Sequence, residues 1–354
     1  MIKYPSIEQY RTAVSNFKSL HSYRGKDEEG KPIYVSVDSF PKLRYRGTVK
    51  LHGTHADVVQ NEDGEIYYQS RNNIINILQD NAGFAAFASK IEDEFKHFFD
   101  IIRSKMTTLE SIVLAGEFCG GNIQKGVALS KLDKMFVIYG IKVGENFVDV
   151  NKFVDVKCHE KKIYHILEFE HWETDFDFEH VSVYQNYLVE KTKQVEHECP
   201  VGKYFGVSGV GEGIVWNCLG SVEDDKVVVN DFSFNPALTF KVKGDEHAVT
   251  KVKTLVEVDL ELENDINKLV DIIVTENRLK QGLDYLREQH VSFEIFNINE
   301  FIKWVVGDVV KEEKERIKES KVDEKKFFGN VKKKSGNWFK QYLNFHLNES
   351  TADI

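Results

Sequence analysis

The sequence predicts an α+β protein in which an antiparallel-sheet core is followed by a mainly helical C-terminal domain. Short strand-like runs, separated by turn residues, recur between residues 34 and 242, which is typical of antiparallel sheets. Beyond residue 263 the apolar residues recur at helical spacing instead. A chain of 354 residues is long enough for two domains that each bury a core. We therefore expect one domain over residues 1–249, with a short N-terminal lead-in, and a second over residues 250–354.

The first domain should begin with a helix from about Ser6 to Leu20, where apolar and aromatic residues share one face. Asn61–Gly64 is a hairpin turn signal between two strand patterns. The apolar, phenylalanine-rich stripe between Asn81 and Arg103 predicts one amphipathic helix that faces the core. The strands that we expect in this domain are Leu43–Val49, Ala56–Gln60, Ile112–Phe118, Met135–Val143, Ile214–Trp216 and Thr239–Val242.

The second domain opens with a stretch that alternates apolar and polar residues, Val252–Leu262, and continues with a strongly helical one, Asn264–Gln289. Asn297 and Glu300 have the spacing of a capping box ahead of an apolar run that ends at Val310. A charged helix should follow that run. These patterns together predict a domain built mainly from helices.

The composition excludes several classes of protein. The formal charge of −10 is not that of a protein coated in nucleic acid, although a local basic patch can still bind RNA. No apolar run reaches the length of a membrane span, and the first residues form no apolar signal core. We therefore expect a cytoplasmic protein, in the host cytoplasm if a phage encodes it. The 4 cysteines contain no C-x-x-C pair, which favours free thiols over a zinc or disulfide framework.

One basic stretch stands out near the C-terminus. Lys325–Lys334 holds five lysines and no acidic residue, and it includes Phe327 and Phe328. The lysines could follow an RNA backbone while the aromatic residues pack or stack. A solvated helix end whose aromatic residues face the domain core would explain the same pattern.

The stretch Thr48–Thr54 contains the residues on which the functional hypothesis depends. Lys50 is followed three residues later by Gly53, and the motif lies between two strand-like runs. Because glycine permits close backbone approach, a ligand could come against the chain beside the lysine. An exposed lysine would account for this motif equally well if the motif stood alone.

Four further motifs follow in order, around Glu117, Tyr139, Glu212 and the pair Lys241 and Lys243. Their segments are Leu114–Phe118, Phe136–Gly140, Gly211–Val215 and Phe240–Lys243. The ordered set resembles the covalent nucleotidyltransferase superfamily of ligases and capping enzymes. With histidine two residues after the lysine, the chain most resembles ATP-dependent RNA ligases of the phage type that seals nicked duplex RNA. The resemblance covers roughly residues 40 to 247 and implies a nucleotidyltransferase core of the ATP-grasp-like ligase fold.

The chemistry of such a ligase requires a neutral amine. An RNA 5′-phosphate is a poor electrophile, so the enzyme first places AMP on itself and then passes it to the RNA end. A free lysine has a pKa near 10.4, so only about 0.04% is neutral at pH 7. Burial and neighbouring positive charge both favour the neutral form. Lys241 and Lys243 share one strand face and could lie beside Lys50 to bind a triphosphate, whereas a solvated strand face would show the same alternation.

The resemblance also implies a role for individual residues. Lys50 would form lysyl-AMP, Arg71 would contact phosphate or ribose, and Glu117 would bind the ribose. Tyr139 would stack on adenine, and Glu212 would lie near Mg²⁺ or Mn²⁺ as the metal-binding residue. The complete expected nucleotide-binding set is Val49, Lys50, His52, Gly53, Arg71, Glu117, Tyr139, Glu212, Lys241 and Lys243.

Two positions depart from the pattern of the family. His55 stands where the family often has asparagine, and Gly140 stands where many relatives carry aspartate. Either departure could alter contacts to the nucleotide or the metal. Neither removes the nucleophile or the paired lysines.

The resemblance implies an ATP-dependent RNA ligase that joins a 3′-OH to a 5′-phosphate through lysyl-AMP and RNA-adenylate, with a role in RNA repair. Its partners would be RNA ends or nicked duplex RNA, and no protein partner is expected. A DNA ligase or a GTP-using capping enzyme would share most of these motifs, but both usually carry aspartate where this chain has His52. An inactive RNA-binding relative, or an enzyme that transfers AMP to a protein or small molecule, would also fit these residues.

Overall fold

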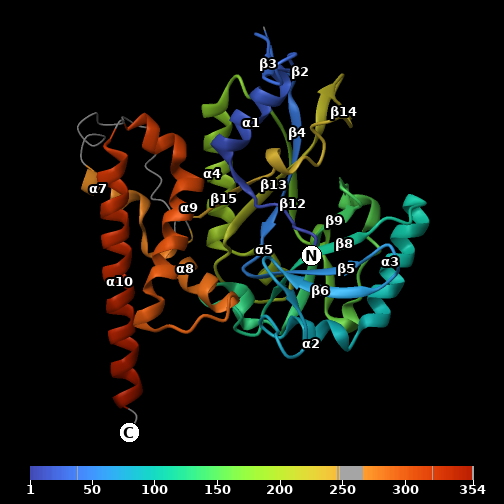
Figure 1. Cartoon of the computed structure of the whole chain (residues 1–354). Helices are drawn as coiled ribbons and strands as arrows, with labels where there is room; N and C mark the ends of the chain where they lie inside the picture. Colours follow the sequence, from blue (N-terminus) through green and yellow to red (C-terminus); the bar gives the residue numbers. More distant parts are fainter. Residues whose placement is uncertain (38, 245–246, 248–265, 321, 353–354) are drawn as a thin grey trace. The chain divides into compact units, whose positions relative to one another are not determined.

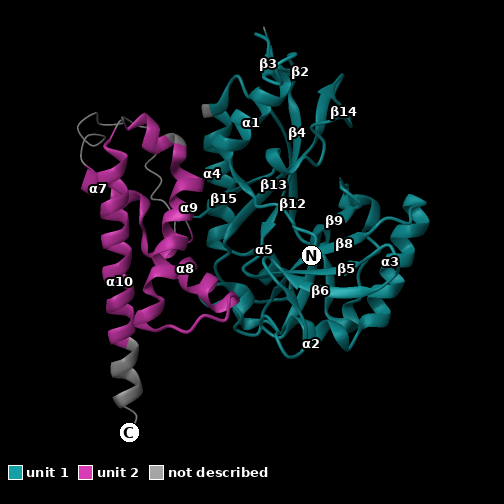
Figure 2. Cartoon of the chain, in the orientation of Figure 1, with its two compact units in different colours: residues 1–244 teal, residues 245–354 magenta. Residues whose placement is uncertain are grey.

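The computed structural model describes residues 1–37, 39–244, 247, 266–320 and 322–352. The chain divides into two compact units, Met1–Gly244 and Asp245–Ile354, which are coloured separately in Figure 2. The expected domain boundary between residues 249 and 250 lies outside the described residues, and so does the alternating stretch Val252–Leu262.

The first sheet of unit 1 has the strand order β1-β15-β13-β4-β12, with β14 paired to β13 (Figure 1). The pairings β15–β13–β4–β12 are antiparallel, whereas the two-residue β1 runs parallel to β15. The strands are β1 (Glu8–Gln9), β4 (Leu43–Lys50), β12 (His171–Phe176), β13 (Gly213–Glu223), β14 (Lys226–Val228) and β15 (Phe240–Lys243).

The second sheet has the order β10-β9-β8-β5-β6-β7, and β11 pairs with β9. It is antiparallel except at that last pairing. Its strands are β5 (Gly53–Gln60), β6 (Ile66–Ser70), β7 (Ile74–Ile75), β8 (Ile112–Cys119), β9 (Met135–Val143), β10 (Asn146–Val148) and β11 (Ile163–His165). Strands β4 and β5 are consecutive but belong to different sheets, so the chain crosses between the sheets at Leu51 and His52. A separate hairpin is formed by β2 (Tyr23–Lys26) and β3 (Pro32–Tyr34).

Two predictions of helices in unit 1 need correction. The N-terminal helix begins at Tyr10 rather than near Ser6, because Glu8 and Gln9 pair with β15. The single helix expected between Asn81 and Arg103 is wrong, since the segment forms α2 and α3. Ile91 leaves the helical conformation, with φ −129° and ψ 27°, and three acidic residues open the second helix, where negative charge is favoured. The helices are α1 (Tyr10–Ser22), α2 (Phe84–Ser89), α3 (Glu92–Met106), α4 (Val181–His197) and α5 (Pro200–Tyr204), with short 3₁₀ turns η1 to η5 between strands.

Two aromatic cores hold unit 1 together. One core contains Phe17 of α1 and Trp216 and Phe240 of the first sheet, all fully buried. In the other, α2 and α3 cover a face of the second sheet, and the ring of Phe84 packs tilted against that of Phe136 with centroids 5.0 Å apart. The phenylalanine stripe therefore packs in the core, as its pattern predicts.

Unit 2 is helical in its described residues, as the sequence predicts. It consists of α7 (Ile266–Ile273), α8 (Glu276–Glu288), η6 (Ile295–Asn297), α9 (Ile298–Glu319) and α10 (Glu324–Ala352). The helical stretch Asn264–Gln289 is interrupted at Thr275, whose side chain caps α8 by accepting from the backbone N–H of Arg278. The predicted capping box at Asn297 is wrong: its side-chain amide donates to the Ser292 carbonyl at 2.9 Å instead.

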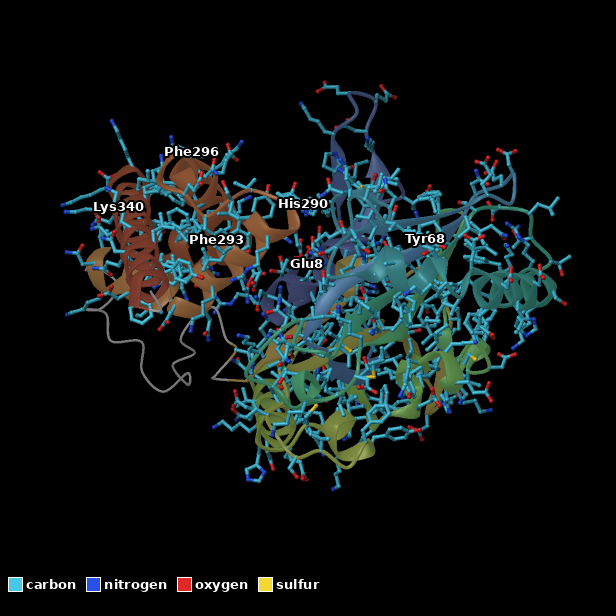
Figure 3. The ribbon with its side chains drawn as sticks, turned by 90° about the horizontal axis from the view of Figure 1, so that it is seen from below. Glu8, Tyr68, His290, Phe293, Phe296 and Lys340 are labelled. Carbon is cyan, nitrogen blue, oxygen red and sulfur yellow. The ribbon has the colours of Figure 1, made fainter. Side chains whose placement is uncertain are left out.

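The basic stretch lies in α10, where its residues have two different environments. Lys325, Lys326, Lys332 and Lys333 are exposed, as is Lys340 further along the helix, which is labelled in Figure 3. Phe327 is fully buried in the core of unit 2, so its ring cannot stack on RNA. Phe328 is partly buried, so it remains a candidate RNA contact together with the exposed lysines. No helix in the described part of the chain is long and apolar enough to span a membrane.

Candidate active site

Strand register brings together charged residues that are far apart in the sequence. Gly213, the first residue of β13, lies opposite Lys50 on one side and Lys243 on the other. Its φ of 151° and the close approach of the Val242 carbonyl leave no room for a Cβ, so glycine is required here. Glu212, directly before this glycine, is thereby held between the two lysines.

The Glu212 carboxylate is the centre of the cluster. One oxygen accepts a hydrogen bond from Lys50 Nζ at 2.8 Å and lies 2.9 Å from His52 Nδ1. The other oxygen pairs with Lys243 Nζ at 3.0 Å. Burial alone would raise the pKa of Glu212, but Lys50 and Lys243 outweigh it and hold that pKa well below its usual range. The carboxylate is therefore ionised and fixes three nitrogen-bearing side chains.

The paired lysines of β15 lie on a partly enclosed face. Phe240 is fully buried and Val242 packs against the same core, while Lys241 and Lys243 project to the other side. Burial and two neighbouring lysines lower the pKa of Lys243, although Glu212 opposes them. The alternation is thus not that of a fully solvated strand face. With Lys50, these residues give the cluster a surplus of positive charge over Glu212, as a binding site for an anion requires.

Glu117 lies on β8 and completes the site from the second sheet. Its Oε1 accepts a hydrogen bond from the Gly53 N–H at 2.9 Å. A Cβ at Gly53 would overlap the Phe118 carbonyl, so this glycine serves the close approach of β5 to β8. Burial raises the pKa of Glu117, against the opposing charges of Lys50 and His55.

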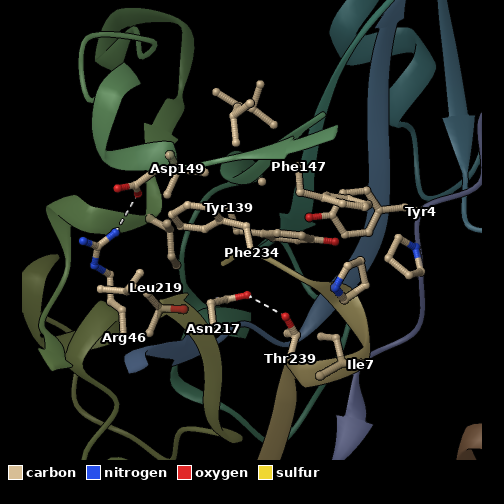
Figure 4. A pocket seen from close by; sticks show the side chains of 18 of the residues that line it. Tyr4, Ile7, Arg46, Tyr139, Phe147, Asp149, Asn217, Leu219, Phe234 and Thr239 are labelled. Atoms are coloured by element: carbon tan, nitrogen blue, oxygen red, sulfur yellow. Dashed lines mark hydrogen bonds and ion pairs between the residues drawn. The ribbon is translucent and has the colours of Figure 1, made fainter. Parts of the chain in front are cut away.

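Tyr139 of β9 lines a pocket between the two sheets, shown in Figure 4. Thr48, two residues before Lys50 and on the same strand face, also lines it. Asn217 of β13, on the first sheet, also lines the pocket and accepts a hydrogen bond from Thr239 Oγ1 at 3.2 Å. An aromatic face with a few polar groups around it suits a flat heteroaromatic ligand. The pocket is lined by Tyr139 rather than by the charged cluster, and Thr48 and Lys50 connect the two places along one face of β4.

Two other members of the expected set lie at the margins of the site. Arg71 follows directly after β6 and is exposed. Val49 is 2% exposed and packs in the core, which leaves only its backbone for the nucleotide contact predicted from the sequence. His52, in the connection between the two sheets, is bound to Glu212 as described above.

Sequence reasoning missed two residues that the structure places beside Tyr139. They are Tyr4, from the N-terminal segment, whose ring lies 5.9 Å from that of Tyr139, and Asp57, which is fully buried on β5 and reaches Tyr139 through His55. Asp57 carried a signal, because an acidic residue inside an otherwise apolar strand must find a partner. Tyr4 carried none, since its position depends on how the N-terminal segment packs.

A divalent metal would find carboxylate oxygens here, but no complete protein cage. Among the described residues no group of three or more His, Cys, Asp and Glu side chains is arranged to hold a metal ion. Mg²⁺ typically takes one or two protein carboxylates together with substrate phosphates, so the donors of Glu212 and Glu117 suit it. Phosphate oxygens would have to supply the remaining ligands.

Comparisons with known proteins identify a family over more than half of the chain. Residues 44–234 match the model of the RNA ligase family. A search of curated protein sequences finds no match. Similar solved structures include a mutant Naegleria gruberi RNA ligase with ATP and Mn, at 14% identity and TM-score 0.43, where the alignment covers 69% of this chain and 57% of that one.

Two further solved structures are similar. The Naegleria gruberi RNA ligase with PPi has 16% identity and TM-score 0.42, over 69% of this chain and 56% of that one. An archaeal ATP-dependent RNA ligase has 9% identity and TM-score 0.39, over 98% of this chain and 67% of that one. This chain thus spans little more than half the length of the Naegleria chains.

Proposed function

This chain belongs to the RNA ligase family, and we propose that it is an ATP-dependent RNA ligase that acts through lysyl-AMP and RNA-adenylate. The observation that carries the proposal is the meeting of Lys50, Glu212 and Lys243 across Gly213. A partly exposed lysine beside a surplus of positive charge is what transfer of a nucleotidyl group to an amine needs. RNA 3′-OH and 5′-phosphate ends are the proposed substrates.

In the first step Lys50 Nζ would attack the α-phosphorus of ATP. A P–N bond forms, the bond from the α-phosphorus to the bridging oxygen breaks, and pyrophosphate leaves. Lys241 and Lys243 would neutralise charge on the departing phosphates. Bound Mg²⁺ or Mn²⁺ would supply further charge neutralisation beside Glu212. The Lys50 ammonium must lose one of its three protons before attack, and solvent water can accept it because the side chain is 20% exposed. The neutral amine keeps two N–H groups, so it can still donate to Glu212 while its lone pair attacks.

In the later steps the AMP moves to RNA and is then displaced. An oxygen of the RNA 5′-phosphate attacks the phosphorus of lysyl-AMP, so the P–N bond breaks and Lys50 regains its amine. The 3′-OH then attacks the activated 5′-phosphate, and AMP leaves as the phosphodiester forms. His52 and Lys243 also contact Glu212, so they would keep its carboxylate in place while Lys50 turns to the substrate.

Incubation of the purified protein with α-labelled ATP and Mg²⁺, followed by denaturing electrophoresis, tests the first step. We expect a covalent label that is lost in Lys50→Ala and kept in Lys31→Ala, whose side chain is 72% exposed on the β2–β3 hairpin. A parallel reaction with GTP tests the nucleotide. Protein must first be freed of bound AMP, and absence of label with either nucleotide would overturn the proposal.

Nicked duplexes test the acceptor. We expect joining of nicked RNA and little joining of nicked DNA by the same preparation. Preference for DNA, or labelling by GTP alone, would assign the chain to a DNA-joining or capping activity instead.

A further inference from the structure

The N-terminal segment of the chain is bound to the second sheet beside the proposed nucleotide pocket. The backbone N–H of Ile2 donates to Gln69 Oε1 at 3.1 Å, and the amide nitrogen of Gln69 donates back to the Ile2 carbonyl. The chain then passes along the pocket, which Tyr4 lines together with Ile7 and Tyr139 (Figure 4). Residues far ahead of Lys50 in the sequence therefore form one wall of the pocket.

A chain of hydrogen bonds runs from the interior of the sheet to Tyr139. The Asp57 carboxylate accepts from Gln69 at 2.7 Å and lies 3.0 Å from His55 Nε2. The other ring nitrogen of His55, Nδ1, lies 2.6 Å from the Tyr139 hydroxyl. The Asp57 oxygen that faces His55 Nε2 also accepts from Gln69, so we assign the His55 proton to Nε2, and Nδ1 then accepts from the Tyr139 hydroxyl.

Tyr4 completes the cluster from the other side. Its ring centroid lies 5.9 Å from that of Tyr139, in an edge-to-face arrangement, and 5.6 Å from that of His55. Directly after Tyr139, Gly140 leaves the space that the Tyr4 hydroxyl occupies. A Cβ at Gly140 would overlap that hydroxyl, while the next nearest ring atom, Cζ, would be 3.0 Å away.

We propose that Tyr4, His55 and Asp57 position the Tyr139 ring for the nucleotide base, so that the N-terminal segment helps to set the affinity for ATP. This inference rests on the proposed function, which places the base against Tyr139. A tyrosine ring held by a hydrogen bond at its tip and an aromatic contact at its edge loses little freedom when a ligand stacks on it. Releasing such a side chain weakens binding by about 2- to 10-fold.

The inference gives a common physical reason for two features of the sequence. His55 supplies the nitrogen that accepts from Tyr139, and Gly140 supplies the space for Tyr4. Both positions belong to one cluster, although they lie on different strands. A change at either position should therefore alter ATP binding through Tyr139 and leave the reacting lysine in place.

The first test combines Gly140→Ala with Tyr4→Phe. We expect Gly140→Ala to raise the Kd for ATP, measured by calorimetry, by about 5- to 10-fold, because its methyl group displaces Tyr4. Tyr4→Phe removes the clashing hydroxyl, so the double variant should bind ATP within about 3-fold of the wild type. Gly307→Ala, a helical position with open space around it, is the control. A Kd for ATP that is unchanged in Gly140→Ala would overturn the inference. So would a double variant that binds ATP no more tightly than Gly140→Ala.

The second test is a cycle of His55→Ala and Tyr139→Phe. Each should raise the Kd for ATP by about 2- to 10-fold. Together they should do no more than either alone, because both remove the same hydrogen bond. Melting temperature is followed for every variant, and a purely structural role would show affinity losses that track it and add up in the double variant.

Binding and labelling together separate the two proposals. If the wild type binds ATP but forms no label on Lys50, the proposed ligase activity fails while the ratios of Kd still decide the role of Tyr4 and His55. If the wild type binds no ATP, both are overturned. With label present, the apparent KM for ATP should rise in each variant in the same order as its Kd.

Discussion

Glu212 in unit 1 and Arg278 in unit 2 are each buried among several side chains of opposite sign, and these two clusters differ in how they are enclosed. In unit 1, Glu212 is 3% exposed, but its partners Lys50, His52 and Lys243 remain 20%, 25% and 12% exposed. A ligand could therefore reach every partner of Glu212. The cluster also contains more cations than carboxylates that face them.

In unit 2, Arg278 is fully buried and its cluster is closed. It donates to Asp308 at 2.8 Å and to Glu313 at 3.2 Å, and it also bonds the backbone carbonyl of Ile273. All three nitrogens of the guanidinium thus have partners within the unit. Because the Arg278 side chain is 0% exposed, a ligand cannot reach the N–H groups that remain.

The comparison shows that burial of a charge does not by itself identify a site. Both clusters are costly to desolvate, and both must be compensated by partners. What distinguishes the cluster around Glu212 is the partial exposure of its partners and their unbalanced charge. One cluster should therefore control chemistry and the other stability, and substitutions can test this division.

The largest effect on stability should come from Arg278→Met. Removing one member of a buried ion pair leaves the remaining charges uncompensated and costs about 3–5 kcal/mol. We expect this loss in urea unfolding followed by circular dichroism, with labelling by ATP retained under native conditions. Lys280→Met, on the same helix with a side chain 60% exposed, should change the free energy of unfolding by less than about 1 kcal/mol. Equal losses in the two variants would contradict the division.

Glu212→Gln should have the next largest effect, and on activity. The amide keeps the shape of the side chain but removes the charge that holds Lys50 and Lys243. We expect the labelling rate to fall about 100-fold, which corresponds to about 2.7 kcal/mol. Glu145→Gln, whose side chain is 94% exposed, serves as the control and should label normally. A Glu212→Gln enzyme within about 3-fold of wild type would remove Glu212 from the mechanism.

The pH dependence of stability tests whether Glu212 is ionised in the folded protein. Because the pKa of Glu212 is lowered in the folded protein, its carboxylate stabilises the fold above the unfolded-state pKa of about 4.3, and this contribution is lost as pH falls through the folded-state value. Glu117 has a raised pKa in the folded protein, so its contribution to the stability of the fold is more favourable at low pH than at neutral pH. The difference in melting temperature between wild type and Glu212→Gln should therefore shrink between pH 6 and pH 3. A difference that is constant with pH would contradict the ionised assignment.

A smaller effect is expected from separating the units. A chain ending at Gly244 keeps both cores of unit 1, since the third core lies wholly in unit 2. We expect its labelling rate to stay within about 3-fold, while joining of nicked RNA falls about 10-fold, or about 1.4 kcal/mol. Gel assays of the two steps on one preparation measure both. Equal loss of both steps in a folded truncation would show that unit 2 acts on the chemistry itself.

The smallest effect should come from the exposed lysines of α10. Replacing Lys332 and Lys333 by alanine should weaken RNA binding about 3-fold and reduce its salt dependence, because phosphate contacts release counterions. Lys334 is less suitable for this test because it pairs with Asp271 at 2.8 Å. Unchanged binding by the double variant would favour a solvated helix face without RNA contact.

The local patterns of the sequence predicted much of the fold, and their failures have physical causes. The positions of β8 and β9 were predicted correctly, because a short continuous run of apolar residues between turns is typical of a buried strand. The helix expected from Asn81 was divided, since helical spacing continues across Ile91 while the backbone does not. Asn297 was misjudged because its side-chain amide is oriented by donating to the carbonyl and the hydroxyl of Ser292, and its oxygen accepts no N–H of the helix.

The sequence by itself determined which residues could do chemistry: Lys50 with Gly53, and two lysines on one face of a strand. These are local properties, fixed by the spacing of neighbours along a strand. Only the tertiary structure decided that Lys50 shares a carboxylate with a lysine 193 positions later, and that Tyr4 lies against Tyr139. The reason is that register between strands distant in sequence depends on the packing of the whole sheet, which no local pattern contains.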